Sequence, residues 1–155
     1  MIEVIRTNSK NTDFIQLVEQ LNNYLKIIDG DEHAFYNQYN NIDVLKHVVL
    51  VYLDDKPAGC GAFKEFDKNS VEIKRMYTSA EYRKKGLAAK VLLELENWAN
   101  EIGYTNSILE TGKRQIEAVN FYKKWNYNVI HNYGQYKNMT NSLCFEKKLL
   151  KNEER

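Results

Sequence analysis

A basic turn that contains a glycine stands near the middle of the chain, between a strand-like segment and an amphipathic one. The turn reads Arg83-Lys84-Lys85-Gly86-Leu87-Ala88. The first N–H groups of a helix are unpaired and the helix dipole favours negative charge there, while Gly86 and Ala88 lack the bulk that would keep a phosphate from the backbone. The segment therefore predicts a pyrophosphate site. A helix with a basic first turn that binds no ligand is the alternative, and spacing alone leaves both open.

Other ligand-binding patterns are missing from the sequence. It contains neither the Gly-x-x-x-x-Gly-Lys-Ser/Thr string of a P-loop nor the Gly-x-Gly-x-x-Gly string of a dinucleotide fold. His33, His47 and His131 lack the spacing of zinc ligands, so no metal is expected. Cys60 and Cys144 form no Cys-x-x-Cys motif, and two thiols do not make a disulfide framework. We therefore expect a cytoplasmic protein in a reducing compartment.

The elements that must position the basic turn follow from hydrophobic periodicity. Strands are predicted at residues 2–6, 47–53, 58–66, 71–78, 106–111, 127–132 and 143–149. Helices are predicted from a cap at residue 11, 12 or 13 to residue 28, at 87–102 and at 115–125, and residues 32–41 form a loop or a short helix. The short connections from the second to the fourth strand favour an antiparallel meander. The element order predicts an α/β (α+β) layer fold with a mixed sheet and a strand–helix–strand crossover.

Length and composition narrow the class of protein. The 155 residues suit one domain over residues 1–155, and 43% apolar with 28% charged residues is typical of a folded globular chain. A net charge of +1 does not favour a nucleic-acid partner. No apolar run approaches the roughly 20 residues that a membrane helix needs, and the first residues lack the features of a signal peptide. No membrane association is expected.

Two motifs at matching positions carry a resemblance to a known family. The segment Arg83–Ala88 resembles the Arg/Gln-x-x-Gly-x-Gly/Ala signature of GNAT acetyltransferases, between strand and helix as in that family. Residues 118–127, Ala-Val-Asn-Phe-Tyr-Lys-Lys-Trp-Asn-Tyr, resemble its Asn-x-x-Phe-Tyr region. The strings at 72–77, 109–112 and 132–136 are similar to a bacterial, small-molecule-type subgroup. Ala80 stands where many members have Pro, and Asn126 where Gly is common, which leaves the path of these two turns open.

The resemblance implies a fold and a coenzyme. It implies the GNAT fold, a central, mostly antiparallel mixed sheet of about seven strands flanked by helices, with a splayed parallel strand pair at the cofactor site. It implies acetyl-CoA, with the pantetheine arm along Met76, Tyr77 and Thr78 and the pyrophosphate on Arg83, Lys84, Lys85, Gly86, Leu87 and Ala88. The Met76 N–H is then an oxyanion donor to the thioester carbonyl. Asn120, Tyr122 and Lys123 would complete the coenzyme contacts.

The resemblance also implies catalytic roles. Tyr122 matches the general acid that protonates the leaving thiolate, with a packed core tyrosine as the alternative. Glu110 and Glu72 are candidate general bases, although either one could instead pair with a neighbouring cation or bind the substrate ammonium.

The acceptor segments follow from the same resemblance. Phe35, Tyr36 and Tyr133, with Tyr136, lie in segments that form the acceptor pocket in relatives. Because Lys74 and Arg75 are adjacent on a strand, we expect them on opposite faces, with one binding an acceptor carboxylate and the other exposed.

The expected activity is acetyl transfer to a primary amine of a small molecule or amino-acid-like acceptor. Acetylation of a protein N-terminus or lysine, and a non-catalytic acetyl-CoA-binding regulatory module, are the alternatives. Because relatives often pair through their C-terminal strands, the resemblance also leaves a homodimer open.

Overall fold

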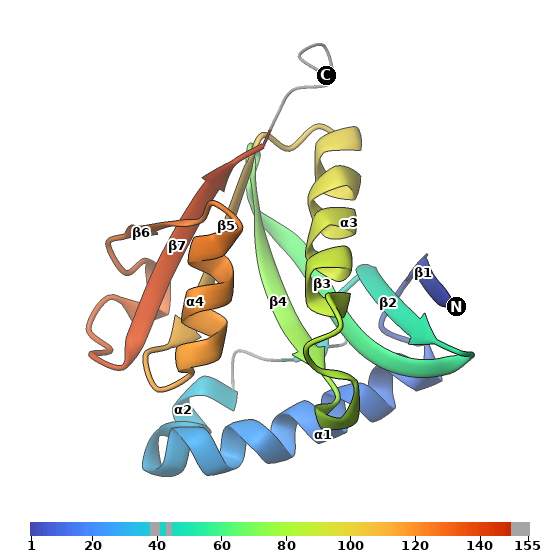
Figure 1. Cartoon of the computed structure of the whole chain (residues 1–155). Coiled ribbons are helices and arrows are strands. Elements are labelled where there is room, and N and C mark those ends of the chain that lie inside the picture. Colours follow the sequence, from blue (N-terminus) through green and yellow to red (C-terminus); the bar gives the residue numbers. More distant parts are fainter. Residues whose placement is uncertain (38–40, 43–44, 150–155) are drawn as a thin grey trace.

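A single mixed sheet runs through the protein (Figure 1). The computed structural model describes residues 1–37, 41–42 and 45–149, and within these residues seven strands follow the order β1-β2-β3-β4-β5-β7-β6. The strands are β1 (Ile2–Thr7), β2 (His47–Leu53), β3 (Lys56–Asp67), β4 (Ser70–Thr78), β5 (Asn106–Gly112), β6 (Asn128–Ile130) and β7 (Ser142–Lys148). Strands β1 to β4 form the predicted antiparallel meander, and β5 is parallel to β4. The predicted fold class is confirmed.

Helices cover both faces of the sheet. They are α1 (Thr12–Asp29), α2 (His33–Asn37), α3 (Leu87–Glu101) and α4 (Ile116–Lys124). The strand β2 shows why two layers form: Val48 and Leu50 pack into a cluster with Phe14 of α1, whereas Val49 and Val51 pack into a second cluster with Leu95 of α3. Alternate residues of a strand face opposite sides of the sheet. The apolar run in β2 is therefore continuous because both of its faces are buried.

The ends of α1 agree with the sequence. The Asn11 side chain accepts hydrogen bonds from the N–H groups of Asp13 and Phe14, at 2.9 and 3.2 Å, which identifies the cap among the three candidates. The helix ends at Asp29, followed by Gly30 with φ +55°. A single 3-10 turn and α2 follow, so the predicted loop or short helix is a short helix at 33–37, and its residues 38–40 lie outside the described part of the chain.

The parallel pair at the centre of the sheet is short. Strands β4 and β5 pair only at Ser70–Asn106, Val71–Ser107 and Glu72–Ile108, and beyond this point they diverge. In Figure 1 the two strands meet at one end and separate toward α1. The predicted splay is confirmed, and it leaves the second half of β4 without a partner on its β5 side within the described residues.

A bulge in β4 corrects one prediction. Ala62 pairs with Lys74 and Cys60 with Tyr77, so Gly61 alone opposes the two residues 75 and 76. Arg75 adopts φ +59°, which few non-glycine residues do. The expectation that Lys74 and Arg75 lie on opposite faces assumed regular alternation and was wrong, because both line the same cavity and the Arg75 side chain is buried.

Two smaller differences concern strand ends. Asp54 and Asp55 both have positive φ, +50° and +68°, which is typical of a two-residue hairpin turn. The strand β3 therefore begins at Lys56, earlier than predicted, and β6 covers only Asn128–Ile130 of the predicted strand. Across the described ranges, no helix combines the length and apolar character needed to cross a membrane.

Candidate active site

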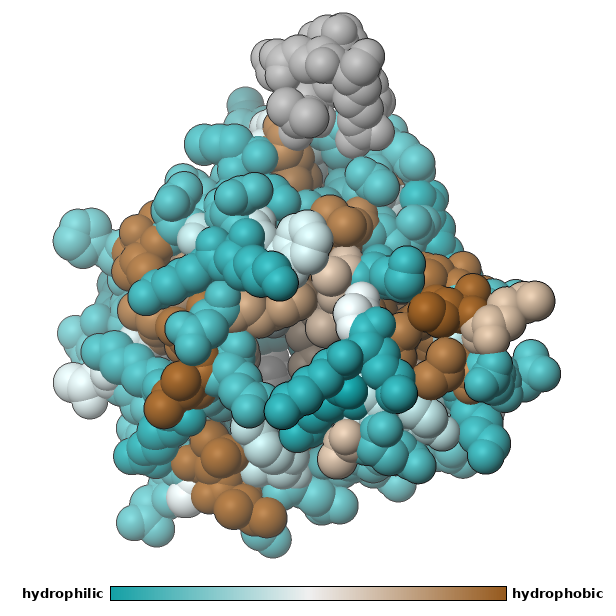
Figure 2. All heavy atoms as spheres, in the orientation of Figure 1, coloured by the Kyte–Doolittle hydropathy of each residue, from teal (hydrophilic) through white to brown (hydrophobic). Residues whose placement is uncertain are grey.

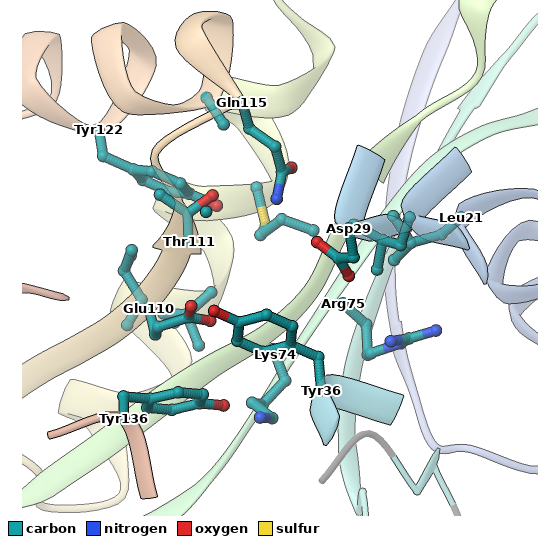
Figure 3. A pocket seen from close by; sticks show the side chains of 16 residues that line it. Leu21, Asp29, Tyr36, Lys74, Arg75, Glu110, Thr111, Gln115, Tyr122 and Tyr136 are labelled. Atoms are coloured by element: carbon teal, nitrogen blue, oxygen red, sulfur yellow. The ribbon is translucent and has the colours of Figure 1, made fainter. Parts of the chain in front are cut away.

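A cavity of about 120 Å³ opens where β4 and β5 diverge (Figure 3). Its walls come from the end of α1, from α2, from the second halves of β4 and β5, and from α4. Of the residues predicted to do chemistry or bind the acceptor, six line this cavity: Tyr36, Lys74, Arg75, Glu110, Tyr122 and Tyr136. Met76, which was predicted to contact the coenzyme, lines it as well. The structure thus brings together side chains that lie as far apart in the sequence as Tyr36 and Tyr136, which are 100 positions apart.

Glu110 is the carboxyl group at the centre of this site. It lies on β5 just beyond the last residue pair with β4, where the strands separate. Burial raises the pKa of Glu110 to about 7, an effect that a hydrogen bond with Ser142 and the charge of Lys74 partly oppose. Its Oε2 atom is buried without a hydrogen-bond partner among the described residues. A carboxyl group with this pKa is present in both protonation states at neutral pH, which suits proton transfer.

Glu72, the other predicted base, lies outside the cavity wall. Its side chain is 3% exposed and accepts a hydrogen bond of 2.7 Å from the Tyr133 hydroxyl. Lys64 lies 3.9 Å from its other oxygen. Glu72 and Tyr133 therefore satisfy each other beside the pocket. Phe35 packs edge-on against Tyr36, with ring centroids 5.3 Å apart, and is also absent from the residues that line the cavity.

Tyr122 faces the cavity from α4. Its ring is 7% exposed and packs against Tyr127 and Phe145, with centroids 5.8 and 6.0 Å away. Burial and the charge of Glu110 raise the pKa of the hydroxyl, so the phenol keeps its proton at neutral pH. The neighbouring positions on α4, Asn120 and Lys123, are exposed. Tyr122 is at once a packed tyrosine and a group that can reach a ligand, so the two expectations for it are compatible.

The basic turn takes the form that an anion site requires. Gly86 precedes α3 with φ +77°, and no side chain in the described part of the protein caps the first N–H groups of that helix. A Cβ atom on Gly86 would meet nothing within 4 Å, so the approach to these N–H groups is open. Lys84 and Lys85 are exposed. Figure 2 shows the surface hollowed between α4 and this turn, with hydrophilic side chains along the rim. An anionic group would find unpaired donors and positive charge here.

Arg83 differs from the other two cations of the turn. Its Nε donates a hydrogen bond of 3.0 Å to the Thr78 carbonyl oxygen. Its guanidinium lies 5.8 and 5.9 Å from the ring centroids of Tyr24 and Tyr77, within the range of a cation–π contact. Arg83 therefore connects the turn to β4 and α1, although it is exposed like Lys84 and Lys85.

Asp29 is a site residue that the sequence analysis did not single out. It was treated only as part of the stop of α1, yet its carboxyl group is 5% exposed and faces the cavity from the wall opposite Glu110 (Figure 3). Burial raises the pKa of Asp29. The helix dipole disfavours a negative charge at a helix C-terminus. An aspartate in the last position of an amphipathic helix was therefore a signal that could have drawn attention to it.

Comparison with known proteins identifies the family. The sequence profile of the Acetyltransferase (GNAT) family matches residues 14–127, which is well over half of the chain. The chain therefore belongs to the GNAT acetyltransferase family, and the resemblance that its motifs indicated is confirmed at this level. The uncharacterized N-acetyltransferase YsnE of Bacillus subtilis is 37% identical over 97 residues, which cover 61% of this chain and 64% of YsnE. The matched segment is thus less than two thirds of that relative's length.

Solved structures share the whole fold. A proposed acyl-CoA N-acyltransferase from Klebsiella pneumoniae superposes with a TM-score of 0.81 at 22% identity, over 97% of this chain and 99% of that one. A GNAT family acetyltransferase from Elizabethkingia anophelis, solved with acetyl-CoA bound, gives 0.70 at 14% identity, over 96% and 98% of the two chains. At these identities the superpositions show a common fold.

Proposed function

We propose that the protein is an acetyl-CoA-dependent N-acetyltransferase that acetylates a primary amine of a small molecule or amino-acid-like acceptor, with residues 1–155 as one catalytic domain. The observation that carries the proposal is the meeting of Glu110 and Tyr122 at one cavity, where β4 and β5 diverge. Ligands of open α/β sheets bind at such an opening. Membership of the GNAT family supports the reaction class.

The chain has residues that suit acetyl-CoA. The open N-terminus of α3, with Gly86, Lys84 and Lys85, suits the pyrophosphate, and the unpaired edge of β4 at residues 76–78 suits the pantetheine amides. Arg83, Leu87, Ala88, Asn120 and Lys123 complete the proposed coenzyme contacts. When bound, acetyl-CoA supplies the activated acetyl group. The backbone N–H of Met76 is proposed to stabilise the developing negative charge on the acetyl oxygen, a contribution of about 3 kcal/mol to the barrier.

Two side chains are proposed to move protons. The acceptor enters the cavity as an ammonium ion, and its proton passes to the Glu110 carboxylate directly or through water. The Tyr122 hydroxyl donates its proton to the leaving sulfur. Each such transfer typically accelerates a reaction by about 10²–10⁴-fold. Glu72 has the weaker case as a base, because its carboxylate already accepts a hydrogen bond from Tyr133 and does not line the cavity.

The size of the cavity supports a compact acceptor. A volume of about 120 Å³, enclosed by Tyr36, Tyr136 and the end of α1, suits a small amine better than an extended peptide. A small acceptor is therefore preferred over a protein N-terminus or lysine side chain.

A thiol-release assay tests the proposal. Purified protein is mixed with acetyl-CoA and a panel of small amines, amino acids, polyamines and peptides, and free coenzyme A is measured. Turnover of a small acceptor, with an acetylated product identified by mass spectrometry, is the expected result. If calorimetry shows tight acetyl-CoA binding but no acceptor is turned over, the protein is a binding module and the proposal is wrong.

A further inference from the structure

The bulge in β4 brings two cations to one wall of the cavity. Ile73 and Met76 both belong to the cluster on the α3 side of the sheet. In a regular strand, one residue would separate two positions that face the same side. Here two residues, Lys74 and Arg75, lie between Ile73 and Met76, and both are among the residues that line the cavity. Arg75 holds a positive φ to do so. Rare backbone conformations of this kind concentrate at ligand sites.

Arg75 is buried, and no anionic partner lies beside it among the residues that the structure describes. Its side chain is 6% exposed, and its NH2 group donates to the Asn22 side-chain oxygen of α1, which is neutral. Its Nε atom is buried and unpaired as far as the described residues extend. None of the ion pairs formed by these residues includes Arg75. Buried charges in proteins are normally paired, so an anion is needed here.

Lys74 adds a second cation beside the first. Burial lowers its pKa, and the charge of Arg75 lowers it further. Glu72 and Glu110 attract it electrostatically, but no ion pair joins Lys74 to a carboxylate in the described part of the chain. Two adjacent like charges in a largely buried wall repel each other. Their arrangement is explained if a bound ligand carries the missing negative charge.

The cavity also carries negative charge. Figure 3 shows the carboxyl groups of Asp29 and Glu110 facing the same space from α1 and β5. The residues that line the cavity therefore include two acidic and two basic side chains, and among the described residues the two basic ones form no ion pair with a carboxylate. A simple amine would interact only with the acidic groups.

We propose that the acceptor is an amino acid, whose ammonium lies against Asp29 and Glu110 and whose free carboxylate lies against Lys74 and Arg75. This assignment rests on the proposed acetyl transfer and adds the chemical class of the acceptor. The reaction converts a zwitterion into an N-acetyl carboxylate. The amine nitrogen bonds to the acetyl carbon and the carbon–sulfur bond breaks. One ammonium proton leaves through Glu110 before the attack, and the second proton of the nitrogen replaces the one that Tyr122 gives to the leaving sulfur. The basic wall then still holds the product by its carboxylate.

Matched sets of acceptors test this assignment. In each set, turnover of an amino acid is compared with turnover of the amine and the amide that lack its carboxylate. The sets are L-phenylalanine with phenethylamine and phenylalaninamide, and L-lysine with cadaverine and lysinamide. A buried charge-assisted contact predicts a kcat/KM about 10- to 100-fold higher for the amino acid. Equal or faster turnover of the compounds that lack the carboxylate would overturn the assignment and leave the proposed function intact. If no acceptor is turned over, the proposed function fails, and the assignment fails with it.

Variants of Lys74 and Arg75 test whether these two residues cause the preference for an acceptor with a carboxylate. Arg75→Asn removes the charge and retains a residue that tolerates positive φ, and Lys74→Gln removes the second charge. Each should raise KM for the amino acid about tenfold, change kcat little, and leave KM for the matching amine unchanged. Lys68→Gln, in the exposed turn between β3 and β4, removes the same charge away from the cavity. It should leave KM for the amino acid and KM for the matching amine unchanged. If Arg75→Asn fails to fold, Lys74→Gln decides: an unaltered KM for the amino acid contradicts the assignment.

Discussion

At the scale of single residues, the chemistry depends on the protonation state of Glu110. Its neutral form dominates below its pKa of about 7 and its carboxylate above it. Only the carboxylate accepts a proton, so kcat/KM should rise with pH through about 7. Free alkyl amines lose their proton at a much higher pH, near the pKa of about 10 of a lysine side chain. A rise in kcat/KM near pH 7 that is measured with an alkyl amine acceptor would therefore report the ionisation of a group of the protein.

The first prediction concerns this rise of kcat/KM near pH 7. Glu110→Gln should lower kcat/KM by about 10²–10⁴-fold and remove the dependence on pH near 7. The measurement is a pH–rate profile from pH 5.5 to 9.5 by thiol release, with Glu81→Gln, an exposed acidic position, as the control. If kcat/KM of Glu110→Gln still rises with pH near 7, another group titrates there.

The second prediction concerns Tyr122. Tyr122→Phe removes only the hydroxyl, while the ring contacts with Tyr127 and Phe145 remain. We expect kcat to fall about 10²-fold, with acetyl-CoA affinity by calorimetry nearly unchanged. Weakened coenzyme binding together with normal turnover would contradict the role of general acid.

At the scale of elements, the bulge in β4 depends on a glycine in the neighbouring strand. A Cβ atom on Gly61 would lie 2.5 Å from the Met76 sulfur and 2.9 Å from side-chain atoms of Val91 and Leu95. We therefore predict that Gly61→Ala destabilises the fold by about 1–3 kcal/mol, because the packed α3 residues cannot all move away. Urea unfolding measures the change. An unchanged midpoint would mean that β3, β4 and α3 pack more loosely than described.

The elements were largely predictable, and their irregularities were not. Helices α1, α3 and α4 and the strands of the meander follow the periodic apolar residues to within a few positions, because burial on a fixed face imposes a fixed spacing. The bulge at Arg75 has no such signature. It depends on space that Gly61 leaves on the partner strand, and a single strand's sequence does not report its partner's register.

At the scale of the whole molecule, the site unites distant parts of the chain. Tyr122 lies within a local motif of the family and was expected at the site, and it lines the cavity. The coenzyme contacts of Arg83–Ala88, which rest on the other motif, stay a prediction. Asp29 was not expected at the cavity, because it reaches Glu110, 81 positions away, only when α1 closes one end of the opening between β4 and β5. The sequence alone does not show which side chains the fold brings to the cavity. For this reason Glu72, Phe35 and Tyr133 were expected at the pocket and are found beside it.

A whole-molecule prediction follows from the proposed coenzyme site. A ligand that binds only the folded state stabilises it by about 2.7 kcal/mol at 100 times its dissociation constant. Saturating acetyl-CoA should therefore raise the melting temperature by several degrees, as measured by calorimetry or a dye-based melt. Lys85→Glu, which reverses an exposed charge at the turn before α3, should weaken this increase, and Lys56→Glu on the far hairpin should not. An equal increase in all three proteins would place the coenzyme elsewhere.

The short seam between β4 and β5 has a mechanical consequence. Among the described residues, the ladder between β4 and β5 has only three residue pairs, and it joins the half of the sheet that carries the meander to the half that carries β5, β6 and β7. Both strands line the cavity beyond this ladder. A substrate that contacts both strands would hold them at one separation, so we expect that binding of either substrate changes the affinity for the other.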